Sequence, residues 1–263
     1  MEIINAHAHV YPQKIAQKAT ETIGEFYHIS MTMPAGTPER LLQDGKEVGI
    51  SRHVIHSVAT TPHQVRSINE FIKNETDKHP EFIGFIALHQ DLTIEEINNE
   101  VDFAIANGFK GIKLHPDFQK FNIDDENAQK LFKTVGDRLP FLIHMGDDRY
   151  DYSKPYRLIN MAKKYPNVRF ISAHFGGYQC WNEVNEYKGL NNVYYDTSSS
   201  LPFISESKAK EIIDMLGVDK FFFGTDFPMW DAKRELERFN KIPLSDTERK
   251  MILSENIKKF LNI

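Results

Sequence analysis

The sequence has only one cysteine, Cys180, among its 263 residues. A single cysteine excludes an intrachain disulfide framework and is typical of a protein from a reducing cytoplasm. A catalytic thiol needs a partner histidine, and the sequence ties no particular histidine to Cys180. We therefore expect Cys180 to be an ordinary, partly buried side chain.

Long apolar runs and basic clusters are also lacking. No stretch of about 18 apolar residues is present, which predicts no membrane span. Lysine and arginine number 32 against 37 aspartate and glutamate residues, and the net charge is −5. Proteins that bind nucleic acid or anionic membranes carry basic surfaces, so we expect neither partner. The start of the chain, MEIINAHAHVYP, lacks the charged and apolar regions of a secretion signal, and we expect a cytoplasmic protein.

A glycine-rich phosphate loop is missing as well. The first apolar segment is followed by HVYPQK, and the first glycine is Gly24. Dinucleotide-binding sheets carry glycines directly after their first strand, so their doubly wound fold is disfavoured. No linker rich in Gly, Ser or Pro and no close repeat divides the chain. We therefore expect a single domain over residues 1–263.

Short apolar segments alternate with longer amphipathic ones. The short segments predict strands at residues 2–8, 52–58, 82–88, 109–115, 141–145, 168–174, 192–198 and 220–226. The amphipathic segments predict helices at 38–49, 62–79, 124–136, 155–165, 178–188 and 204–216, with 10–36 as the loop after the first strand. Thr93 with Glu96, and Ser245 with Glu248, have the spacing of a capping box at a helix start. Eight strands alternating with helices, in a chain close to the typical length of about 250 residues, predict an α/β protein with a (β/α)8 TIM barrel.

Ionisable side chains collect at the ends of the predicted strands. They are His7, His9, Lys113, His115, His144, His174 and Asp226. Catalytic groups of a (β/α)8 barrel lie at the C-terminal ends of its strands, so we expect these side chains to meet at one mouth. Residues two apart on a strand point the same way, which puts His7 and His9 on one face.

Several histidines and one aspartate at one mouth predict a metal site. Buried polar groups are costly unless they are paired or bound to metal. Imidazole nitrogen and carboxylate oxygen are usual ligands of Zn²⁺, and imidazole also suits iron, nickel and copper. A His-x-His pair alone is a weak indication. Its place at the end of the first strand, with matching residues at later strand ends, favours a catalytic metal centre.

Five segments resemble the amidohydrolase superfamily. They are NAHAHVYP at the start, GIKLHP at 111–116, FLIHMGD at 141–147, ISAHFGG at 171–177 and FGTDFP at 223–228. The segments occur in the expected order and span nearly the whole chain. Within the superfamily, the sequence is similar to the amidohydrolase-related branch (amidohydrolase 2) that includes aminocarboxymuconate-semialdehyde decarboxylase and γ-resorcylate decarboxylase.

The resemblance implies a TIM barrel of the metal-dependent hydrolase type and assigns roles to the residues at its mouth. One divalent ion is expected, usually Zn²⁺ with Mn²⁺ or Fe²⁺ as alternatives, and its implied ligands are His7, His9, His144 and Asp226. His174 resembles the active-site histidine that orients the metal-bound water or transfers a proton. Asp226 is expected to act in catalysis as well.

Three further residues are expected to contact the substrate. Lys113 stands where binuclear relatives carry a carboxylated lysine, but this branch is generally mononuclear, so we expect an uncarboxylated lysine or an ion-pair partner. His115 follows on the same face. Arg149 is the best candidate to bind an anionic substrate group, with pairing to Asp147 or Asp148 as its alternative role. The segment 10–36 is compact compared with the better-known decarboxylases, which leaves the shape of the pocket open.

Two reactions fit this set of residues. The first expectation is hydrolysis of a small amide, ester or lactone through a metal-activated water, because hydrolysis needs only water and an electrophile. The alternative is non-oxidative decarboxylation of a small aromatic or enoic acid, in which Asp226 or His174 delivers a proton to carbon as CO₂ leaves. Either way the partner is a small molecule, and a homodimer is left open.

Other readings of the sequence have less support. A nuclease of the TatD type also begins with His-x-His, but those enzymes carry a strand-four glutamate where this chain has Lys113. A non-catalytic binding protein is disfavoured because the full set of site residues is present. His53 and His56, on the second strand, are expected to be satisfied core or surface histidines rather than ligands.

Overall fold

Eight parallel strands form the centre of the computed structural model, which describes residues 2–263. The strands are β1 (Ile3–His9), β2 (Ile50–His56), β3 (Phe82–Ala87), β4 (Gly111–Leu114), β5 (Phe141–Ile143), β6 (Phe170–Ser172), β7 (Val193–Asp196) and β8 (Phe221–Phe222). Each strand pairs in parallel with the next in the sequence. Backbone hydrogen bonds from Ala6 to Phe223 (2.8 Å) and from Asp226 to His7 (2.9 Å) join β1 to the chain after β8. The sheet therefore curls into the predicted (β/α)8 barrel.

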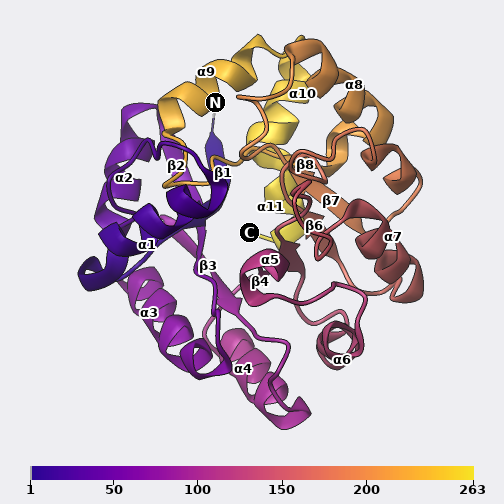
Figure 1. Cartoon of the computed structure of the whole chain (residues 1–263). Helices are drawn as coiled ribbons and strands as arrows, with labels where there is room; N and C mark the ends of the chain where they lie inside the picture. Colours follow the sequence, from indigo (N-terminus) through magenta and orange to yellow (C-terminus); the bar gives the residue numbers. More distant parts are fainter. Residues whose placement is uncertain (1) are drawn as a thin grey trace.

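Most of the helices surround the ring of strands, whereas α11 (Asn256–Leu261) packs against its apolar interior (Figure 1). The helices are α1 (Gln13–Tyr27), α2 (Pro38–Glu47), α3 (Val65–Lys78), α4 (Ile94–Ala106), α5 (Pro116–Gln119), α6 (Glu126–Val135), α7 (Pro155–Lys164), α8 (Glu206–Leu216), α9 (Ala232–Lys241), α10 (Asp246–Lys250) and α11. Four short helical turns accompany them, namely η1 (Pro62–Gln64), η2 (Val184–Tyr187), η3 (Val218–Lys220) and η4 (Met251–Glu255). The hydroxyl groups of Thr93 and Ser245 accept from the backbone of Glu96 and Glu248, which confirms both capping boxes.

The helices were also compared with the length and apolar composition of a membrane-spanning helix. Within residues 2–263, none of the helices combines the length and the apolar character that crossing a membrane requires.

An apolar floor fills the inside of the barrel beneath the polar strand ends. It is built from buried side chains of several strands and of α11, including Ile4, Val54, Phe85, Leu142, Ile171, Phe222, Ile257 and Phe260. Leu142 precedes His144 by two residues and therefore lies directly below it on the same face. The floor is apolar and buried, and close packing of such side chains holds the polar side chains above it at a fixed level.

A bulge in β1 turns both histidines of the His-x-His pair into the barrel. The segment 5–8 of β1 spans three steps, whereas its partner segment 53–55 of β2 spans two. One extra residue in a strand reverses the alternation of inward and outward side chains. Ile4 packs in the interior floor before the bulge, and His7 and His9 also point inward after it.

Some strands are shorter than the sequence predicts. The predicted strand 168–174 is reduced to β6, and 220–226 is reduced to β8. His174 and Asp226 consequently lie just beyond the strand ends. Their backbones adopt the left-handed conformation, with φ of 62° and 59°, which cannot continue a strand.

Two other segments differ from the prediction. The segment 10–36 was predicted as a loop, but it contains the 15-residue helix α1, which buries Ala16, Ile23 and Tyr27. The segment 178–188 was predicted as a helix, but only η2 forms there. The backbone N–H and C=O groups of Tyr178 form hydrogen bonds with the loop after β5, so they are not available to start a helix.

Candidate metal centre

The structure brings together all seven side chains that the sequence places at strand ends. Each of them is buried, although each carries a group that can ionise. They are His7 and His9 of β1, Lys113 of β4, and His115, His144, His174 and Asp226 from the loops that follow β4, β5, β6 and β8. A cluster of this kind, buried at the C-terminal ends of the strands, is where a barrel enzyme has its active site.

Asp226 is the carboxylate at the centre of the cluster. Its Oδ1 atom lies 3.3 Å from Nε2 of His7 and 3.4 Å from Nε2 of His9. Its Oδ2 atom accepts a hydrogen bond of 2.6 Å from the hydroxyl of Ser199. Burial alone would raise the pKa of Asp226, but the neighbouring His7 and His9 hold this pKa well below its usual value. Asp226 is therefore an anion that faces two imidazole rings.

Three histidines have one ring nitrogen held from behind, and we call His7, His144 and His174 the backed side of the cluster. His7 donates from Nδ1 to Asp196 at 2.8 Å, which leaves the lone pair on Nε2. His174 donates from Nδ1 to the carbonyl of Ser198 at 3.1 Å, which leaves its lone pair on Nε2 as well. Such contacts are typical of metal sites, where they set the tautomer and orient the ring.

His144 is held in the same way through its other nitrogen. Its Nε2 lies 3.3 Å from Asp117 and 3.3 Å from the hydroxyl of Tyr27, so the carboxylate favours the proton on Nε2. Its Nδ1 then carries the lone pair and faces Nε2 of His174 at 2.9 Å. Two lone pairs at this distance repel each other unless a proton lies between them or a metal cation lies beside them. This arrangement fits a bound cation.

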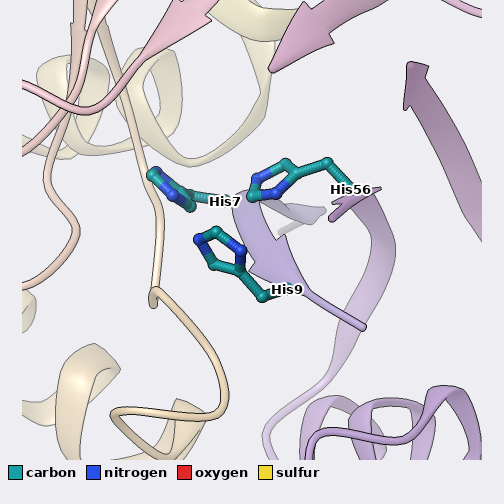
Figure 2. Close-up of side chains that lie close together, drawn as sticks. All are labelled: His7, His9 and His56. Atoms are coloured by element: carbon teal, nitrogen blue, oxygen red, sulfur yellow. The ribbon is translucent and has the colours of Figure 1, made fainter. Parts of the chain in front are cut away.

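Two histidines form the open side of the cluster, namely His9 and, beside it at the end of β2, His56. Within residues 2–263, Nδ1 of His9 and both ring nitrogens of His56 are buried and lack a hydrogen-bond partner. The rings of His9 and His56 lie 4.4 Å apart, edge to face, and His7 lies 4.9 Å from His56. Figure 2 shows the three rings gathered at the ends of β1 and β2. The expectation that His56 is an ordinary, satisfied histidine is thus wrong as regards its hydrogen bonding.

Burial keeps most of these rings neutral. It lowers the pKa of His9 to about 3 and that of His174 to about 4, and it holds the pKa of His144 well below the usual value. Burial also lowers the pKa of Lys113 to about 8. Neutral imidazole is the form that binds metal. Neutral imidazole nitrogens beside the Asp226 anion are a donor set that suits a divalent cation.

The expected substrate contacts occupy different surroundings. Lys113 donates to Nε2 of His7 at 2.9 Å, in the middle of the cluster. Both ring nitrogens of His115 have partners, the backbone N–H of Phe118 and the hydroxyl of Tyr27. The roles of Lys113 and His115 in substrate binding stay predictions.

Arg149 sits above the cluster in the loop after β5. Its guanidinium group forms two hydrogen bonds to Asp147, at 2.9 and 2.6 Å, and a third to the backbone carbonyl of Phe26. The Asp147 partner is the alternative that the sequence left open for this arginine. The third bond ties the loop to the end of α1, where a positive charge is favoured by the helix dipole. A direct contact of Arg149 with substrate stays a prediction.

Sequence reasoning did not single out four residues that shape the site. They are Asp196, Asp117, Tyr27 and Ser198. Asp196 ends β7, and the rule that polar residues at strand ends are functional could have found it. Tyr27 left no such signal, because it lies on α1, in a segment predicted as a loop.

Solved structures share this architecture over almost their full length. One is dihydroxybenzoic acid decarboxylase from Polaromonas sp. JS666, with bound manganese and the inhibitor 2-nitroresorcinol, at 16% identity and a TM-score of 0.74, covering 99% of this chain and 97% of that one. Another is 5-carboxyvanillate decarboxylase from Novosphingobium aromaticivorans, with manganese and 4-hydroxy-3-methoxy-5-nitrobenzoic acid, at 16% identity and a TM-score of 0.78, covering 99% and 96%. A third is an uncharacterized TIM-barrel protein from Bordetella bronchiseptica, at 14% identity and a TM-score of 0.80, covering 100% and 99%. At these identities the likeness shows the fold.

The sequence itself matches one protein family. Among curated proteins, none matches this chain. The family described as Amidohydrolase, in contrast, matches residues 4–263, a range that includes the whole buried cluster. The resemblance seen in the five sequence segments is confirmed by this match, and the chain belongs to the amidohydrolase family.

Proposed function

We propose that the protein is a metal-dependent, non-oxidative decarboxylase of a small aromatic or enoic acid. Hydrolysis is the first expectation from the sequence and decarboxylation the alternative. Two of the similar structures are decarboxylases of substituted benzoic acids that hold manganese and an aromatic ligand. These relatives support the alternative over hydrolysis, and they support a small-molecule substrate.

The observation that carries the proposal is a narrow, apolar-walled space next to Asp226. Its volume is about 10 Å³, and its walls include Ile23, Phe118 and Met229 beside the histidines. A space of this size holds about one water molecule at most. Decarboxylation consumes no water, and removal of water favours the change from a charged carboxylate to neutral CO₂.

An aromatic acid is larger than this space and has to displace side chains to reach the cluster. Ile23 and Phe118 are the side chains to move, because both also line a neighbouring cavity of about 680 Å³ between α1 and α3. That cavity has the volume of an ordinary small-molecule pocket. We propose that the organic part of the substrate enters from there.

The proposed metal ligands are those that the sequence implied, namely His7, His9, His144 and Asp226. A divalent cation bound there supplies positive charge that neutralises and orients the oxygens of an anionic substrate. Manganese in the two relatives supports Mn²⁺ ahead of the Zn²⁺ expected from the sequence. Burial lowers the pKa of Lys113 to about 8 in the metal-free protein, so Lys113 carries a positive charge there at lower pH.

Asp226 and His174 are the groups proposed to carry a proton to the substrate carbon. Because Asp226 is an anion and His174 is neutral in the free protein, each first takes up that proton from water or from a hydroxyl group of the substrate. Decarboxylation breaks the bond between the carboxyl carbon and the substrate carbon, and the electron pair stays on the substrate carbon. That carbon takes up one proton as CO₂ leaves. Asp226 lines the space next to the cluster, and Nε2 of His174 lies 2.9 Å from His144, which lines it as well. The step requires a proton carrier within hydrogen-bond reach of the substrate carbon.

The test is a substrate screen of Mn²⁺- and Zn²⁺-loaded protein in D₂O. One panel contains hydroxylated benzoic acids and enoic acids, followed by CO₂ release, and the other contains amides, esters and lactones, followed by hydrolysis. We expect CO₂ release, with one deuterium at the carbon that lost the carboxyl group. The exposed His63 provides a control variant, His63→Ala, which should match the parent protein. Hydrolysis without CO₂ release would overturn the proposal.

A further inference from the structure

His56 is the most unusual residue of the cluster. It ends β2, its side chain is fully buried, and its Cα pairs with that of His9 across the sheet. Neither ring nitrogen has a partner among residues 2–263. A buried imidazole without partners destabilises a folded protein, so such a group calls for an explanation.

The barrel itself accounts for where the ring points but not for what it binds. Val54 packs in the interior floor, and His56, two residues later on the same strand, is therefore directed inward as well. There the ring meets His9 and His7 edge-on, at 4.4 and 4.9 Å between ring centres. The rings thus meet edge to face, and the contacts provide no hydrogen bond to either nitrogen of His56.

The spacing of the nitrogens suits one metal ion. His7, His9 and His56 can each offer one nitrogen such that all three lie within 4.8 Å of one another. Nitrogens bound to one ion at about 2.1 Å lie at most about 4.2 Å apart. Small rotations of the three rings therefore bring them to coordination distance.

We propose that His56 is a further ligand of the divalent cation, on the same ion as His7 and His9. This role rests on the metal site proposed above, but it does not depend on which reaction the site performs. It adds a ligand from β2 to a set that was otherwise drawn from β1 and from the loops after β5 and β8. In this arrangement the metal ion is the partner of a ring nitrogen of His56 on the open side.

His53 provides a matched control on the same strand. It is buried like His56, but it points to the opposite face, where it lies 3.5 Å from the side-chain amide of Asn5 and packs against Phe82. The two histidines share residue type, strand and burial. They differ in whether they face the cluster.

The experiment measures metal binding without substrate. Metal-free parent protein and the variants His56→Leu, His53→Leu and His9→Leu are titrated with Mn²⁺, and their Co²⁺ forms are compared by visible absorption. We expect His56→Leu to weaken Mn²⁺ binding about tenfold or more and to change the Co²⁺ spectrum, because a nitrogen ligand is lost. His53→Leu should leave both readouts unchanged.

Thermal unfolding is a second measurement, in which we expect His56→Leu to have opposite effects without and with metal. Without metal, His56→Leu should unfold at the same temperature as the parent or a higher one, because an unpaired buried polar group has been removed. With saturating Mn²⁺, it should gain less stability than the parent gains. A variant that fails to fold is replaced by His56→Asn, which keeps a polar side chain and should also bind Mn²⁺ more weakly.

The outcomes separate this inference from the site itself. Unchanged Mn²⁺ affinity and an unchanged Co²⁺ spectrum in His56→Leu, together with weakened binding in His9→Leu, would overturn the role of His56 and leave the metal site standing. Unchanged binding in both variants would overturn the site as well.

Discussion

The backed side and the open side of the cluster differ in how many hydrogen bonds the rest of the protein makes to their ring nitrogens. On the backed side, Asp196, Ser198 and Asp117 each hold the outer nitrogen of a histidine, so ring orientation and tautomer are set by the folded chain. On the open side, the ring nitrogens of His56 find no such support within residues 2–263. The folded chain therefore fixes one half of the site through its own hydrogen bonds, whereas the described residues give His56 in the other half no such support.

Asp226→Ala tests the link between the two sides and should have the largest effect. Asp226 contacts His7 of the backed side and His9 of the open side, so its loss removes an anion that both share. We expect activity to fall at least about 10³-fold, with metal content falling alongside it. Metal analysis and turnover measure this, with the exposed Asp102→Ala as control. Retained metal and turnover would refute the assignment of Asp226.

His174→Ala tests whether the backed side does chemistry as well as binding. We expect activity to fall by about 10²- to 10⁴-fold, because a positioned proton donor is lost, while the metal stays bound. Turnover and metal content are measured on the same preparation. Loss of the metal in this variant would instead make His174 a ligand, which its 2.9 Å approach to His144 allows.

Asp196→Asn weakens the hydrogen-bond support behind His7, which makes this part of the backed side resemble the open side. Asp196 accepts from Nδ1 of His7 and from the backbone N–H of His174, and an amide in its place supports both rings less well. We expect metal affinity to fall about 10- to 100-fold with a smaller loss of activity at saturating metal. Metal titration measures the first effect. An affinity equal to that of the parent would show that the support from behind is dispensable.

Glu235→Gln tests whether an unpaired buried oxygen outside the cluster affects the stability of the protein. Its effect should be the smallest of the four. Within the described chain, Glu235 of α9 pairs one carboxylate oxygen with Arg238 and leaves the other without a partner. Burial raises the pKa of Glu235 from 4.5 to about 8. The folded protein therefore binds the extra proton more tightly than the unfolded chain, and stability falls as the pH rises from 4.5 through 8.

Glutamine has no proton to lose, so the variant should show a flatter dependence of stability on pH across this window. Chemical unfolding at several pH values measures the slope. Equal slopes for variant and parent would mean that the unpaired oxygen of Glu235 has no energetic consequence.

Much of the fold and the mouth of the barrel followed from the sequence. Alternating apolar and amphipathic segments have periods that a local reading detects, and the eight strands they predict are present. The His-x-His pair, His144, His174 and Asp226 were found because polar residues directly after apolar strands stand out. The helix α1 was missed, and with it Tyr27, whose hydroxyl reaches two histidines of the cluster.

The sequence alone determined where strands and helices alternate along the chain and which residue types follow each strand. Both depend on local pattern. The tertiary structure decided which side chains meet. The bulge in β1 depends on register with β2, and it is this bulge that turns the His-x-His pair inward. The support of His7 by Asp196, 189 residues later in the chain, and the missing partners of His56 arise only when the barrel closes. A hydrogen bond between distant residues is a property of three-dimensional packing, and no local period of the sequence encodes it.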